Sequence, residues 1–169
     1  MPAPTVSKIV SGGQTGVDRA ALDVAISLKI PHGGWCPRGR RSEDGGIADV
    51  YQLTETKSAN YAVRTEKNVT DSDGTLILYR NRMSRGTALT ASFTRRHLRP
   101  CLTIDISAMQ SGESDDGWRA SKVKEIRNWL VQEAIEVLNV AGPRESTSAG
   151  ISADAHKLLL NVFADYCQN

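Results

Sequence analysis

Apolar segments of strand length alternate with helical patterns along almost the whole chain, and this alternation constrains the fold most. Four segments have strand character, and they are residues 6–10, 74–79, 101–106 and 136–141. Their Val, Ile and Leu content is typical of strands buried on both faces of a parallel sheet. We therefore predict a three-layer α/β fold, in which an open and mainly parallel sheet of about five strands has helices on both faces.

The remaining segments complete one domain, residues 1–169. Helical patterns cover residues 15–28, 61–71, 86–98 and 151–166, and another runs from Val123 to Ala134. Residues 30–36 suit a short strand only weakly because they contain Pro and Gly. Residues 37–60 show no clean period and predict a long ordered loop, and residues 111–117 predict an acidic loop. We find no repeat and no linker that would divide the chain.

A glycine-rich run, SGGQTGVDR at residues 11–19, joins the first strand to the first helix. A helix that begins on a tight glycine turn directs backbone N–H groups and its positive dipole end at one small volume, where a phosphate fits. Thr15 and Asp18 have capping-box spacing, so Asp18 is either a cap or a ligand contact. Gln14 has no such explanation, and we expect its amide at the mouth of the site. The run matches neither GxGxxG nor the Walker sequence.

Two further strand-to-helix loops, residues 80–87 and 142–148, must reach the same sheet edge if the strands are parallel, and ligands bind at that edge. The first loop suits a polyanion, although an exposed basic loop explains its charges equally well. The second could grip a phosphate and a ribose, or form a local salt bridge. Their polar residues are Arg80, Arg82, Ser84, Arg85 and Thr87 in the first loop, and Arg144, Glu145, Ser146, Thr147 and Ser148 in the second.

Residues of the long loop and of the helix after it are further candidates. An aromatic ring beside arginines can stack a heterocycle and neutralise charge, although Trp35 could equally cap the core. The long-loop candidates are Trp35, Arg38, Arg40, Arg41, Glu43 and Asp44. The helix could add Arg64, Glu66 and Asn68 from one side of the site.

Composition excludes several other classes of protein. A net charge of +2 argues against bulk electrostatic binding of nucleic acid. Three scattered cysteines without a CxxC pair suit a reducing cytoplasm, and we expect a cytoplasmic protein without a secretory signal or a membrane span. The three histidines lack metal-ligand spacing, and no Ser-His-Asp set or GxSxG sequence is present, so we expect no metal site and no nucleophile of that kind.

The run at residues 11–19, with Ala20-Ala21-Leu22-Asp23 after it, resembles the opening motif of the molybdenum carrier family, a circularly permuted branch of the SLOG superfamily. The resemblance continues at residues 33–40, 72–75, 86–87 and 139–144. It implies a Rossmann-like fold with a nucleotide pocket. Related Lonely Guy-type phosphoribohydrolases carry paired glycines and a Glu where this chain has Ser84-Arg85-Gly86 and Thr90, which argues against that activity.

We therefore expect a carrier or sensor of a phosphate-bearing heterocycle, either a nucleotide or a molybdenum cofactor-type pterin, that forms a homo-oligomer. The alternative is an enzyme that cleaves an N-glycosidic bond, with Glu145, Asp18 or Glu43 as acid or base. The candidate ligand-binding residues are Gly12, Gly13, Gln14, Thr15, Gly16, Arg38, Arg82, Ser84, Arg85, Gly86, Thr87, Gly142, Pro143, Arg144, Glu145 and Ser146.

Overall fold

A five-stranded parallel sheet forms the centre of the computed structural model, which describes residues 5–110 and 116–165. Its strands, in spatial order, are β2 (His32–Gly33), β1 (Lys8–Val10), β9 (Val137–Ala141), β7 (Gly74–Tyr79) and β8 (Cys101–Asp105). Every pairing in this sheet is parallel. The predicted fold class is thus confirmed, including the weak strand after residue 30, which is only two residues long.

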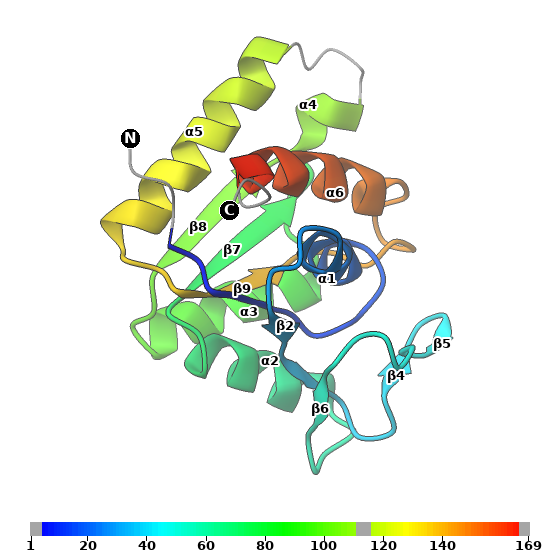
Figure 1. Cartoon of the computed structure of the whole chain (residues 1–169). Coiled ribbons are helices and arrows are strands. Elements are labelled where there is room, and N and C mark those ends of the chain that lie inside the picture. The colour runs from blue at the N-terminus through cyan, green and yellow to red at the C-terminus, as the bar shows by residue number, and fades with distance from the viewer. Residues whose placement is uncertain (1–4, 111–115, 166–169) are drawn as a thin grey trace.

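Helices cover both faces of the sheet (Figure 1). The helices α1 (Val17–Ser27), α5 (Asp116–Gln132) and α6 (Ile151–Val162) lie on one face, and α2 (Tyr61–Thr70) and α3 (Arg85–Arg96) lie on the other. The short helix α4 (Ser107–Gln110) follows β8. The main apolar core lies between the sheet and the helices α1, α5 and α6. It contains the fully buried side chains of Leu76 and Leu78.

Two further pairs of short strands lie beside the sheet. Strand β3 (Trp35–Cys36) pairs in parallel with β6 (Thr54–Glu55), and β4 (Arg41–Ser42) forms a hairpin with β5 (Gly45–Gly46). The strands β4, β5 and β6 lie within the predicted long loop and were not indicated by the sequence. Arg40 orders this region because its guanidinium donates hydrogen bonds to the carbonyls of Ile47, Leu53, Ala48 and Tyr51. The loop is therefore a built substructure beside the sheet (Figure 1).

Two helix starts differ from the prediction. Helix α1 begins at Val17 with Gly16 as its N-cap and with no side-chain cap, so the capping box of Thr15 and Asp18 is wrong. Gly16 has φ +83°, and a Cβ there would lie 2.3 Å from the carbonyl oxygen of Pro143. Helix α3 begins at Arg85, where the Ser84 side chain caps it. The acidic loop predicted at residues 111–117 lies mostly outside the described residues.

Candidate functional site

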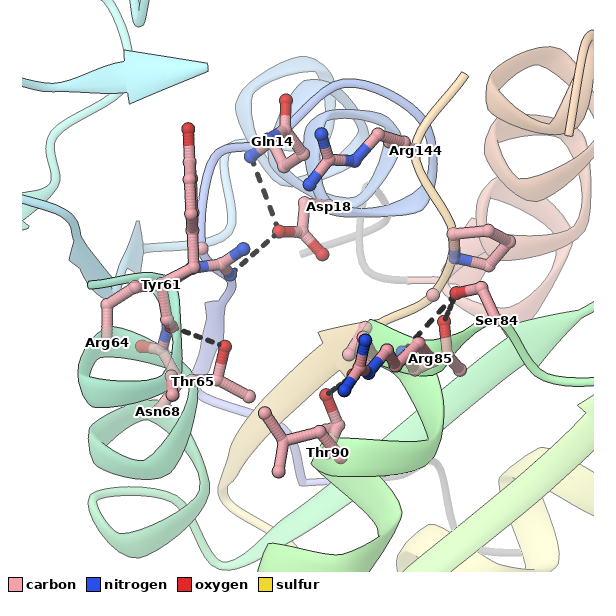
Figure 2. Close-up of a pocket in the computed structure, with 18 of the residues that line it drawn as sticks. Gln14, Asp18, Tyr61, Arg64, Thr65, Asn68, Ser84, Arg85, Thr90 and Arg144 are labelled. Carbon is pink, nitrogen blue, oxygen red and sulfur yellow. Dashed lines mark hydrogen bonds and ion pairs between the residues drawn. The ribbon is translucent and has the colours of Figure 1, made fainter. Parts of the chain in front are cut away.

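A pocket of about 390 Å³ opens at the carboxyl ends of β1, β9 and β7, between α2 and the start of α3. Figure 2 shows its walls, with side chains of α2 on one side and Ser84 and Arg85 on the other. This volume suits a small organic ligand. The predicted candidates that line it are Gly12, Gln14, Asp18, Arg64, Asn68, Ser84, Arg85, Gly86, Thr87, Gly142, Pro143, Arg144 and Thr147.

The start of α3 presents unused hydrogen-bond donors to this pocket. The side chain of Ser84 accepts the Thr87 N–H at 3.4 Å, and the Ala88 N–H donates to the Ser84 carbonyl at 2.8 Å. The N–H groups of Arg85 and Gly86 meet no acceptor among the described residues. The exposed guanidinium of Arg85 likewise has no carboxylate partner in the described part of the chain. Free N–H groups, a helix dipole and an unpaired cation together favour an anion.

The glycine-rich loop, by contrast, uses most of its N–H groups in hydrogen bonds within the protein. The N–H groups of Gly13, Gln14 and Thr15 donate to Ser11 Oγ, Asp18 Oδ2 and Gln14 Oε1, at 3.4, 3.3 and 3.1 Å. The Val17 N–H donates to the Pro143 carbonyl at 3.3 Å. The loop therefore leaves little of the open anion cradle that its sequence suggests.

Arg64 occupies the space that Gly12 leaves free. A Cβ on Gly12 would lie 1.4 Å from Arg64 Nη1, so the guanidinium packs directly on the glycine backbone. From there Nη1 pairs with Asp18 Oδ2 at 3.1 Å, and both side chains are nearly buried. The missing side chain at Gly12 thus lets Arg64 of α2 reach Asp18 of α1 and form an ion pair.

Among the described residues that line the pocket, Asp18 is the only acidic one. It is only 4% exposed. Burial raises the pKa of its carboxyl, while the positive charge of Arg64 and hydrogen bonds from the Gln14 backbone and the Arg64 side chain act in the opposite direction. Raised carboxyl pKa values occur at functional sites and in structural ion-pair networks alike.

Gln14 has the structural role that the sequence did not reveal. Its Oε1 accepts the N–H groups of Thr15 and Glu43, at 3.1 and 2.9 Å, so the expectation that Gln14 has no structural role is wrong. Those two donors fix the orientation of the amide, because a flipped NH₂ group would face them. Its buried Nε2 then finds no hydrogen-bond partner among the described residues. An orphaned buried donor in a pocket wall is costly unless a ligand or water accepts from it.

Arg144 enters the pocket from the loop after β9. Its guanidinium carbon lies 5.9 Å from the centre of the Tyr61 ring, and Arg64 lies at the same distance from that ring. Its contact with the Glu43 carboxylate is long, at 3.9 Å. Arg144 therefore keeps most of its positive charge for the pocket.

Glu43 lies outside the pocket and ties three loops together. Its carboxylate accepts the hydroxyl groups of Thr15 and Ser146 and the Ser146 N–H. Desolvation works against ionisation here, but the hydrogen bonds from Ser146 and Thr15 outweigh it and lower the pKa of Glu43. Neither Glu43 nor these two partners line the pocket, so the structure gives them a bracing role.

Glu145 also has a structural role. Its carboxylate accepts the N–H groups of Gly150 and Ser152 at the start of α6. It does not line the pocket. Of the three predicted acid or base candidates, Asp18 is the one that the fold brings to the pocket.

Several basic and aromatic candidates lie away from the pocket. Arg38 is exposed and does not line the pocket. Arg80 is buried against Asp154 and the carbonyl of Ala149. Gly13 packs toward Leu53 of the long loop. Trp35, Arg40, Arg41, Asp44, Gly16 and Glu66 are likewise absent from the pocket walls.

Helix α2 supplies wall residues that sequence reasoning missed. Tyr61, Ala62 and Thr65 join Arg64 and Asn68 on one side of the pocket. The sequence held a usable signal, because a helix that connects parallel strands runs antiparallel to them and so starts at their carboxyl edge. Asn139 and Thr90 were also missed.

Other kinds of site find no support in the described part of the chain. No cluster of three or more His, Cys, Asp or Glu side chains could hold a metal ion there. Cys36 and Cys101 are free thiols, and burial raises the pKa of each. None of the described helices is long and apolar enough to span a membrane.

Comparison with known proteins places the chain in a family. The model of the circularly permuted YpsA SLOG family matches residues 9–163. A crystal structure from Syntrophus aciditrophicus, named "putative molybdenum carrier protein", is 43% identical, covers 95% of this chain and 97% of its own, and has a TM-score of 0.88. No curated protein matches. The resemblance inferred from the glycine-rich run is thus confirmed, and the chain belongs to the circularly permuted YpsA SLOG family.

Proposed function

We propose that this protein binds a phosphate-bearing heterocyclic ligand, a nucleotide or a molybdenum cofactor-type pterin, in the pocket between α2 and α3. One observation carries the proposal. The Arg85 and Gly86 N–H groups have no acceptor among the described residues, and they belong to a pocket that the side chains of Arg85 and Arg144 also line. A phosphate at the start of α3 would accept from both N–H groups, in a pocket made positive by Arg85 and Arg144.

The opposite side of the pocket suits the heterocycle. Tyr61 offers a ring face, and the Gln14 Nε2 donor and the Asp18 carboxyl offer hydrogen bonds to a ring edge. Such a division, with an anion at one end and a flat polar ring at the other, matches both ligand types. The name of the Syntrophus relative supports the pterin, and the wall residues do not discriminate between the two.

Gly86→Val tests the phosphate position without disturbing the fold. A Cβ at Gly86 meets no atom within 4 Å, and valine is a slightly better helix former than glycine, so stability should stay within about 0.5 kcal/mol. The side chain would cover the N–H groups, and we expect binding of nucleoside monophosphates to weaken at least about tenfold. Gly46→Ala is the matched control, because its Cβ also meets nothing within 4 Å and it lies in the β4–β5 hairpin.

Calorimetry should compare AMP, GMP, the bare nucleosides, inorganic phosphate and molybdopterin handled without oxygen. The proposal requires a phosphorylated ligand to bind more tightly than its unphosphorylated form, and the Gly86→Val loss to exceed that of Gly46→Ala. Equal affinity for nucleoside and nucleotide would contradict it. Release of free base from a monophosphate would instead identify an enzyme, and Asp18→Asn would then be the variant to assay.

A further inference from the structure

A second cavity adjoins the pocket on the far side of Ser84 and Arg85. Its volume is about 820 Å³, and residues 80–85, Gln110 and residues 147–149 form most of its wall. Four residues line both cavities, and they are Ser84, Arg85, Pro143 and Thr147. The two hollows are therefore neighbours across a shared wall.

The charged side chains that line the second cavity are all positive among its described wall residues. Three arginines line it, and no acidic residue is among its described wall residues. Arg80 is neutralised by Asp154. Arg82 and Arg85 are exposed and have no carboxylate partner in the described part of the chain. The cavity thus keeps the charge of two guanidinium groups.

The loop that carries Arg82 is held in a defined shape. Asn81 has φ +58°, and its N–H donates to the Asp105 carboxylate at 3.1 Å. The Arg82 N–H donates to the Arg80 carbonyl at 2.6 Å. Arg80 in turn donates to the Ala149 carbonyl at 2.7 Å, which ties this loop to the loop before α6. Arg82 is therefore presented from an ordered backbone.

We propose that the second cavity receives the other half of an extended ligand, in which a nucleoside-like group is joined through a diphosphate to a second group. This inference rests on the proposed function, since the first group and its phosphate would occupy the pocket between α2 and α3. The diphosphate lies at the shared wall, where Arg85 serves both cavities. Arg82 contacts the second phosphate and the group beyond it.

The test compares ligands of similar charge and different length. The tightest binder among AMP, GMP, CMP and UMP is measured by calorimetry beside the corresponding P1,P2-dinucleoside diphosphate. Both carry a net charge of roughly −2 at neutral pH, so bulk attraction is nearly equal. We expect the dinucleotide to bind at least about tenfold more tightly.

Arg82→Gln tests whether the tighter binding of the dinucleotide comes from the second cavity, because Arg82 lines this cavity and is absent from the walls of the first. We expect it to weaken the dinucleotide about fivefold and the monophosphate less than about twofold. Arg95→Gln, an equal loss of charge at the exposed far end of α3, should change neither affinity by more than about twofold.

Equal affinity for the two compounds, or an equal loss of both in Arg82→Gln, would overturn the inference while leaving the proposed function standing. If the monophosphates, inorganic phosphate and molybdopterin all fail to bind, the proposed function fails and this inference fails with it. If molybdopterin alone binds, the proposed function stands and this inference is overturned.

Discussion

Gly12→Ala should break a buried ion pair without straining the backbone. Gly12 is not among the residues of positive φ, so alanine can adopt its conformation. The new methyl carbon would lie 1.4 Å from Arg64 Nη1 and 2.9 Å from Asp18 Oδ2. The flexible Arg64 side chain must move away, which relieves the clash and ends its 3.1 Å contact with Asp18.

The cost follows from how deeply the pair is buried. The side chains of Arg64 and Asp18 are 13% and 5% exposed. Removal of one partner from a buried pair costs about 3–5 kcal/mol, and protonation of the abandoned carboxyl limits the loss. We therefore expect Gly12→Ala to lower the free energy of unfolding by about 3 kcal/mol at pH 8.

The loss of stability in Gly12→Ala should depend on pH. Burial holds the folded-state pKa of Asp18 above its ordinary value, and loss of the Arg64 charge raises it further. A carboxyl with a raised folded-state pKa binds more protons when folded, so its effect on stability becomes unfavourable as pH rises. The deficit of Gly12→Ala should therefore be small where Asp18 is protonated in both proteins and larger at higher pH.

Urea unfolding followed by tryptophan fluorescence, at pH 5 and pH 8, measures this difference. Gly46→Ala is the control and should stay within about 0.5 kcal/mol at both values. In an Asp18→Asn background, Gly12→Ala should cost much less, because no buried charge is abandoned. A deficit that is independent of pH and unchanged in that background would refute the reasoning.

Two further predictions concern residues outside the pocket. Glu145→Ala removes the acceptor for two N–H groups at the start of α6, so we expect about 1 kcal/mol of lost stability and unchanged ligand affinity, measured by urea unfolding and calorimetry. Hydrogen bonds from Arg19 lower the pKa of Asp44 to about 2, so its contribution is present above the ordinary value of 3.8 and lost as pH falls toward about 2. Because Asp44 is half exposed, Asp44→Asn should remove less than about 1 kcal/mol. If the stability difference between the original protein and Asp44→Asn stays constant between about pH 2 and 6, this pairing is contradicted.

The elements and the pocket edge follow from local pattern. The apolar run of β7 is buried along nearly its whole length, as such a run predicts. The parallel arrangement then brings the three predicted loops to one edge, because each leaves the carboxyl end of a strand. Fold class and the general location of the candidate site were therefore predictable from residue order alone.

The roles of individual side chains were not predictable in this way. Gly12 accommodates Arg64, and Glu43 binds Thr15 and Ser146, across long separations in sequence. These contacts depend on the path of the long loop, whose two-residue strands have no detectable period.

The sequence by itself determined a parallel α/β sheet whose glycine-rich and arginine-bearing loops share an edge. Only the tertiary structure decided which loop keeps free donors. Neighbouring side chains already satisfy most N–H groups of the glycine-rich loop, while Arg85 and Gly86 at the start of α3 keep theirs. The physical reason is that a backbone donor can bind a ligand only when the fold has placed no acceptor beside it, and acceptors come from anywhere in the chain.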